Sequence, residues 1–158
     1  MFHGMTRQTR LSTLVLAALL AGCSSSGGGS TTGPSSTELQ VAGSYQVAPT
    51  ITSNPCGTVD VQPGPATVAH AAGATEVRIT HFSLTHTGQV QRSGSFATQP
   101  VTLALGNGST DTVTMSGQFA TGGFDATVNV DTNHAGAAPC RYVVRWQATK
   151  QGTPNVIP

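Results

Sequence analysis

The stretch CRYVVRWQATK, residues 140–150, decides the fold of this chain. Its apolar side chains recur at every second position, at Tyr142, Val144, Trp146 and Ala148. Successive side chains of a β-strand point to opposite faces of the sheet, so an alternation of this kind predicts a strand with one buried face. The stretch therefore predicts a β-strand that begins at Cys140.

The same period-two pattern recurs in earlier parts of the chain. It covers residues 39–47, 101–105, 113–119 and 124–130. Glycine- and asparagine-rich segments at 106–108, 121–123 and 132–139 separate the later runs, and such residues favour tight turns. After residue 38 no stretch has the spacing of an amphipathic helix.

The middle of the chain is less regular. Val77 and Ile79 follow one phase of the alternation, whereas Phe82 and Leu84 follow the other. A β-bulge near residues 80–81 would reconcile the two phases. We further expect a turn at residues 87–88 that leads into a strand around Val90.

These patterns predict an all-β domain, an antiparallel meander of seven or eight strands. The meander either closes into a small barrel or folds as a sandwich, and one disulfide closes it. Only 8% of the 158 residues are charged and the formal net charge is +1, so the chain lacks the basic surface that nucleic-acid binding needs.

The first residues have the composition of an export signal. Arg7 and Arg10 precede a short apolar run, residues 11–20, which spans about 15 Å as a helix and is too short to cross a bilayer. Leu20, Ala21, Gly22 and Cys23 follow, and this sequence resembles the lipobox of bacterial lipoproteins. The resemblance implies that residues 1–22 form a cleaved signal peptide.

The same resemblance implies that Cys23 carries the lipid. Two or three acyl chains on this residue would anchor the protein stably in a membrane. Ser24 follows the cysteine in place of Asp. In the Gram-negative pattern this predicts a cell-envelope protein that is sorted to the outer membrane and faces the periplasm.

Three further segments follow the signal peptide. Residues 23–37 are the lipidated cysteine and a Ser/Gly-rich tether with no large apolar side chain, which we expect to behave as a coil with an end-to-end distance of roughly 20 Å. Residues 38–150 form the β domain. Residues 151–158 are expected to be a flexible tail.

Two cysteines remain after Cys23. Cys56 and Cys140 would be exported to an oxidising compartment, so we expect a disulfide between them. The bond would close a loop of about 85 residues and stabilise the fold by roughly 4 to 5 kcal/mol on the chain-entropy model.

Candidates for chemistry are few. The histidines that could bind a metal are His70, His81, His86 and His134, but His81 and His86 would lie on opposite faces of a regular strand. An enzyme would need a cleft that groups His70, His81 or His86 with Asp60, Asp111 or Asp125. No nucleophile elbow or calcium loop is complete, so we expect no catalysis, no metal and no cofactor.

The domain also resembles small bacterial lipoproteins with a lipocalin-like or similar β-barrel domain of unknown function. The residues that carry this resemblance are Gly43, Ser44 and Tyr45, the cysteine pair, and the last strand from Cys140 through Trp146. Tyr45 stands where lipocalins have Trp. The resemblance implies a barrel whose mouth could accept a small apolar ligand.

Three functions therefore stand as hypotheses. In the first, a membrane-anchored structural or interaction module docks an envelope protein through an exposed strand edge or apolar patch. In the second, a lipocalin-like barrel carries a small hydrophobic ligand. In the third, which the scarcity of site residues disfavours, the domain is an enzyme.

Overall fold

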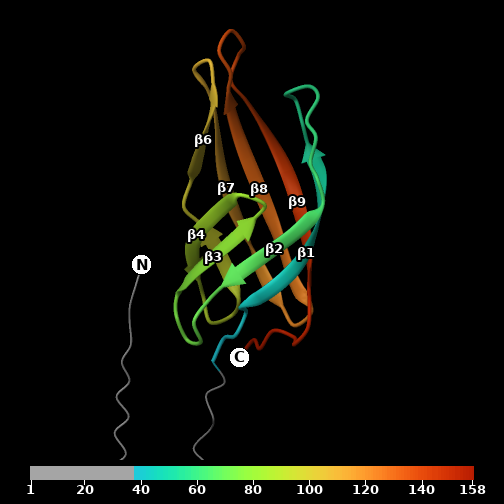
Figure 1. The fold of residues 1–158 in the computed structure, drawn as a ribbon, viewed down its shortest axis with the longest axis vertical. Coiled ribbons are helices and arrows are strands. Elements are labelled where there is room, and N and C mark those ends of the chain that lie inside the picture. Colours follow the sequence, from blue (N-terminus) through green and yellow to red (C-terminus); the bar gives the residue numbers. More distant parts are fainter. Residues whose placement is uncertain (1–37) are drawn as a thin grey trace, which may run out of the picture. The chain divides into compact units, whose positions relative to one another are not determined.

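The computed structural model describes residues 38–158. The predicted signal peptide (residues 1–22) and the whole predicted tether with Cys23 (residues 23–37) lie outside the described residues. The described part is all-β (Figure 1), and its strands are β1 (Gly43–Ser53), β2 (Gly64–Ala69), β3 (Glu76–His81), β4 (Leu84–Val90), β5 (Ser95–Thr98), β6 (Val101–Gly106), β7 (Ser109–Ala120), β8 (Gly123–Asn133) and β9 (Cys140–Lys150).

Eight of these strands close into an antiparallel barrel. Their order is β5-β4-β3-β2-β1-β9-β8-β7, and β5 pairs with β7 to close the ring. β6 is additional, because it pairs with β7 beyond the end of β5. The predicted antiparallel all-β fold with one disulfide is thus confirmed, and of the two predicted architectures the barrel is the one that forms.

The barrel has a short side and a tall side. β2 to β5 are short, whereas β7, β8, β9 and β1 each have 11 or 12 residues. β1 pairs with β2 only through residues 43–47, and β5 meets β7 only at 116–118. Beyond those pairs the tall strands continue, with β6, as a curved sheet that no longer closes (Figure 1). We call this part the open section: β6 with residues 109–114 of β7, 129–133 of β8, 140–143 of β9 and 48–53 of β1.

Side chains fill the inside of the barrel. The alternating residues that point inward belong to one buried hydrophobic cluster, with Tyr45, Ile79, Met115 and Phe119 among its most deeply buried members. Phe119 lies between Phe96 and Phe124, with ring centroids 4.8 and 5.4 Å away. The interior is therefore a packed core, as in other small barrels.

The structure corrects the prediction for residues 77–90. The change of phase after Ile79 is not a bulge but a reversal of the chain, because β3 and β4 form a hairpin whose turn residues are Phe82 and Ser83. Phe82 adopts a positive φ of 50°, which few non-glycine residues do. Gly88, predicted to lie in a turn, lies inside β4 opposite Val77.

The C-terminal segment packs against the end of the barrel where residue 38 enters. Gln40 and Val156 form an antiparallel bridge, and Asn155 is buried. The Asn155 side chain donates hydrogen bonds to the carbonyls of Ala120 and Gly123. This part of the predicted flexible tail therefore closes the bottom of the barrel, and we call that end the closed end.

Between residues 38 and 158 no helix has the length and hydropathy needed to cross a lipid bilayer.

Candidate functional site

The open section carries the features that can contact another molecule. Three connections of the chain gather at this end: the β1–β2 loop (54–63), the β6–β7 turn and the β8–β9 loop (Figure 1). The described N-terminal residues and the C-terminus lie at the closed end. Residue 38, the first residue that the structure describes, thus lies at the end opposite the open section.

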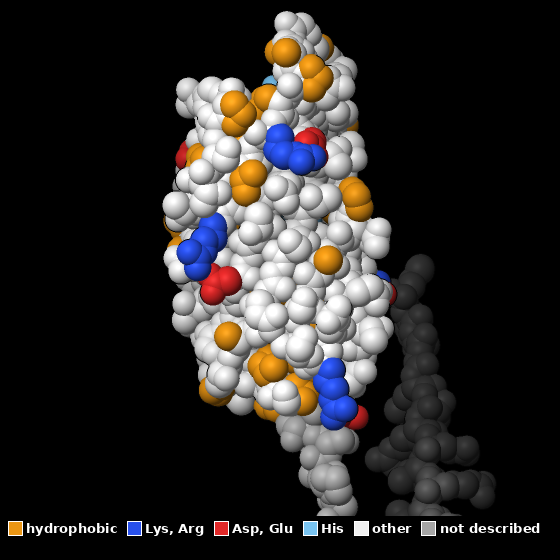
Figure 2. Space-filling model, turned by 180° about the vertical axis from the view of Figure 1, so that it is seen from behind, with side chains coloured by type: hydrophobic (Ala, Val, Ile, Leu, Met, Phe, Trp, Pro, Cys, Tyr) orange, Lys and Arg blue, Asp and Glu red, His pale blue; other side chains and the backbone are white. Residues whose placement is uncertain are grey.

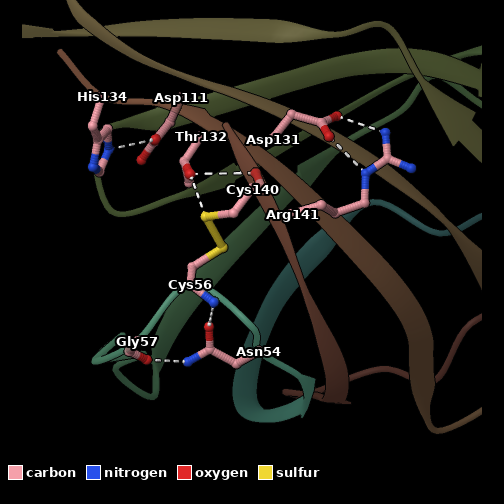
Figure 3. Close-up of a disulfide and its surroundings, with 9 residues drawn as sticks. All are labelled: Asn54, Cys56, Gly57, Asp111, Asp131, Thr132, His134, Cys140 and Arg141. Carbon is pink, nitrogen blue, oxygen red and sulfur yellow. Dashed lines mark hydrogen bonds and ion pairs between the residues drawn. A yellow bond between two sulfur atoms is a disulfide. The ribbon is translucent and has the colours of Figure 1, made fainter. Parts of the chain in front are cut away.

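A disulfide joins two of these connections. Cys56 in the β1–β2 loop is bonded to Cys140 at the start of β9, and their Cα atoms are 5.6 Å apart. The Asn54 side chain shapes the loop, since it accepts a hydrogen bond from the Cys56 amide and donates one to the Gly57 carbonyl (Figure 3). On the other side, the Thr132 hydroxyl lies 2.8 Å from Cys140 Sγ. The predicted cysteine pair is confirmed, and it holds the loop across the open section.

A surface cavity of about 610 Å³ lies beside the disulfide. Asp111, His134 and Tyr142 are its titratable lining residues, and Val59 and Pro139 contribute apolar walls. His134 Nε2 lies 3.2 Å from Asp111 Oδ1 (Figure 3). Burial, with a smaller effect of the Asp111 carboxylate, raises the pKa of the Tyr142 hydroxyl above its usual value. The cavity has an acidic group and no Lys or Arg in its lining.

The four histidines considered as metal ligands are not gathered into one group. Among the described residues, no three His, Cys, Asp or Glu side chains lie close enough together to hold a metal ion. His81 and His86 do share a face, because the hairpin brings both into the barrel interior beside Trp146. His70 lies 2.9 Å from the Ala74 carbonyl near the closed end.

Within residues 38–158 no hydrogen bond or ion pair joins the aspartates considered for catalysis to His70, His81 or His86. Asp60 accepts a hydrogen bond from Gln62, Asp125 pairs with Arg145, and Asp111 pairs with His134. His134 was considered for metal binding but not for the catalytic group. Only the register of β7 on β8, which places Thr110 opposite Asn133, brings His134 to Asp111, and no local sequence signal predicts that pairing.

The outer face of the tall strands is mostly uncharged. Figure 2, which views the molecule from behind and thus looks onto β7, β8 and β9, shows a polar surface with isolated pairs of opposite charge. Two of the pairs are Arg141 with Asp131 and Arg145 with Asp125. Hydrogen bonds from Arg141 lower the pKa of the Asp131 carboxyl. Exposed pairs of this kind attract no particular partner, since their charges cancel locally.

Exposed apolar side chains lie toward the open section. Within residues 38–158 the two large hydrophobic side chains that are exposed are Phe82, at 61%, and Leu105, at 52%. Phe82 is in the β3–β4 turn, where its ring approaches Gly64 at the end of the β1–β2 loop. Leu105 is near the tip of β6. No local sequence pattern marks either residue as part of a site.

The edge of β6 that faces away from β7 is also free to pair with another strand. In the described part of the chain β6 pairs with β7 alone, so one side of it has backbone N–H and C=O groups with no partner strand. An exposed strand edge and an exposed apolar patch are the two docking features that the sequence analysis expected.

Comparisons with models of known protein families, with curated proteins and with solved structures found no match.

Proposed function

We propose that this chain is a lipid-anchored protein of the bacterial cell envelope whose barrel binds another envelope protein and catalyses no reaction. The observation that carries the proposal is the contrast between a packed barrel and an open section with an unpaired strand edge. Phe82 and Leu105, the large hydrophobic side chains exposed within residues 38–158, also lie toward that section. A packed interior supports the interaction module over the carrier, since a carrier of the lipocalin kind binds its ligand inside the barrel.

The anchor supports the same function. The lipobox ending at Cys23 and the Ser/Gly-rich residues after it would hold the barrel by its closed end, where residue 38 enters. The open section would then be the part of the domain that is free to meet partners. The charged side chains on its outer face, such as Arg141 and Asp131, pair with each other, which would make that contact largely independent of long-range electrostatic attraction.

Two experiments test the proposal. In the first, cells are labelled with a radioactive fatty acid, and we expect label on the native chain and none on a Cys23→Ser variant. An unlabelled native chain would refute the anchor.

The second experiment places a photoreactive amino acid at single positions of the full-length protein in cells. We expect cross-links to one discrete envelope protein from Ala104 in the open section, and none from the exposed Thr67 on the short side. Equal cross-linking from both positions would refute the open section as the binding surface.

A further inference from the structure

We propose that the edge of β6 binds an extended segment of a different envelope protein, which adds to the sheet as a further strand. This inference rests on the proposed function and names the chemistry of the partner. The regular part of the edge is residues 101–104, which pair with β7 in a constant register. An added strand would satisfy the backbone groups along this edge, as strand addition does in other recognition domains.

The route of the chain explains why the edge is free. β5 and β6 lie one after the other along the same edge of β7, with Ala97 opposite Ser116 and Val101 opposite Val113. The register shifts by one residue between these pairs, where Gln99 and Pro100 interrupt the strand. β4 follows β5 up to a hydrogen bond from the Gln99 amide to the Thr87 carbonyl. Past this hydrogen bond the two chains separate, and no residue of β4 pairs with a residue of β6.

The second free edge of the open section is blocked, which makes the bare edge of β6 distinctive. Residues 48–53 of β1 pair with β9 but not with β2. This edge contains Pro49, which has no N–H to offer, and a register shift between Ile51 and Ser53. The disulfide-held loop follows directly. Prolines and bulges are devices that keep edge strands from pairing with other chains.

β6 has few features of the kind that keep an edge strand from pairing with another chain. Its sequence VTLALG contains no charged residue and no proline, and its one register shift lies at the tip, between Ala104 and Gly106. Val101 and Leu103 are half-buried on the side that faces the buried Val113, and Thr102 and Ala104 are exposed on the other side. A partner strand would thus meet apolar side chains on one face and small uncharged ones on the other. We expect the partner segment to alternate apolar and polar residues.

A second copy of this chain fits the edge less well than a foreign segment. If β6 paired antiparallel with β6 of another copy, the two barrels would point in opposite directions. The closed end of one copy would then lie away from the membrane by about the length of β8, roughly 36 Å for its 11 residues. A Gly/Ser-rich tether typically reaches about 20 Å, so two copies in one membrane would have to stretch it.

The test uses the full chain in detergent and a synthetic peptide of alternating threonine and valine with lysines at both ends. We expect binding that slows amide hydrogen exchange of β6 residues and leaves that of β8 unchanged. Two further peptides carry N-methyl groups on backbone amides. In the first peptide these amides lie along one edge of the extended strand, and in the second along the opposite edge. Only one of these should bind, because a strand pairs with β6 through one edge.

Protein variants provide the matched control. Leu103→Lys should weaken peptide binding at least about tenfold, since a charge on the inner side of an edge strand opposes pairing. Thr127→Lys, on the exposed face of the central strand β8, should leave binding unchanged. If Leu103→Lys has a lowered unfolding midpoint, Ala104→Lys, whose side chain is exposed, replaces it.

Several results would overturn the inference. These are equal binding of both N-methylated peptides, protection of residues around Asp111 in place of β6, and a dimer of the native chain that Leu103→Lys dissociates. Each would leave the proposed function intact, because fatty-acid labelling and cross-linking from the open section test that function separately. Conversely, an unlabelled native chain would refute the anchor without affecting the peptide result.

Discussion

At the closed end of the barrel the Tyr45 hydroxyl lies 2.7 Å from Asn155 Oδ1, and Lys150 Nζ lies 2.7 Å from the same oxygen. At the open end the hydroxyl of half-buried Tyr142 has no such partner within the described residues and faces a surface cavity. Burial, partly offset by the Asn155 hydrogen bond, raises the pKa of Tyr45 to about 12. One tyrosine is thus part of a closed polar network, and the other lines a surface where a partner could bind.

The difference between the two ends shows how one set of strands provides both stability and binding. Where the sheet closes, side chains from opposite walls meet and exclude water, so each buried apolar group adds to stability. Where the sheet stays open, Val113 and Val130 are still buried, and a disulfide holds the β1–β2 loop beside a surface cavity. The aromatic core is therefore fully enclosed where the sheet closes, whereas the open section is held by the disulfide and has the available surface.

Removing the disulfide should have the largest effect. The double variant Cys56→Ala with Cys140→Ala should lose about 4 to 5 kcal/mol of unfolding free energy, because 84 residues separate the cysteines and the reduced unfolded chain gains that freedom. Urea denaturation measures the loss, and the native chain under reducing conditions is the control. A loss below about 1 kcal/mol would mean that the open section does not depend on the bond.

A core aromatic should matter almost as much. Phe119→Ala should cost about 3 to 5 kcal/mol, since Phe119 is fully buried among Tyr45, Phe96 and Phe124. Phe82→Ala, which truncates the exposed phenylalanine on the side of the open section, should cost less than about 1 kcal/mol. Thermal unfolding of both variants compares the two regions directly. Similar losses would contradict the division into a packed and an open part.

The two tyrosines allow a finer comparison. Tyr45→Phe should lose about 1 to 2 kcal/mol, because it removes the hydroxyl, whose single hydrogen is shared between the Val41 carbonyl and Asn155 Oδ1, 2.6 and 2.7 Å away. Tyr142→Phe should change the unfolding free energy by less than about 0.5 kcal/mol. Chemical denaturation at neutral pH provides both values. If the Tyr142 variant loses more, the polar network at the closed end is not the stabilising one.

His86 should have the smallest effect on the unfolding free energy at neutral pH, and its effect should grow as the pH falls. Burial, with a smaller effect of the neighbouring His81, lowers the pKa of His86 in the folded protein. Below about pH 6.5 the unfolded chain binds a proton that the folded chain does not, so stability should fall with falling pH until the folded-state pKa is reached. Unfolding curves between about pH 7 and pH 5 measure this slope.

Two variants show whether the slope arises inside the barrel. His86→Gln should flatten the dependence of unfolding free energy on pH, whereas His134→Gln, at the open end, should retain it. The reverse result would assign the pH dependence to the open section. Of the two imidazole nitrogens of His86, Nδ1 is buried without a hydrogen-bond partner, which is consistent with a neutral ring in the folded state.

Residues with a strong alternating pattern were predictable. The strands that begin at Val101 and Cys140, and the pattern of β7 and β8, follow directly from period two. β2 was missed because its inward residues are Gly64, Ala66 and Val68, of which the first two are too small to stand out in the sequence. The β3–β4 turn was missed because Phe82 is not a turn-forming residue type and takes a positive φ that phenylalanine rarely adopts.

The sequence by itself determined the strand class and the pairing of the two domain cysteines, because each depends on local composition or on a count of residues; the anchor at Cys23 is a proposal from the same kind of local pattern. Only the tertiary structure decided that the sheet closes, that Asp111 meets His134 and that β6 has a free edge. These features depend on strand order and register, and hence on contacts between residues far apart in the chain, which no local pattern encodes.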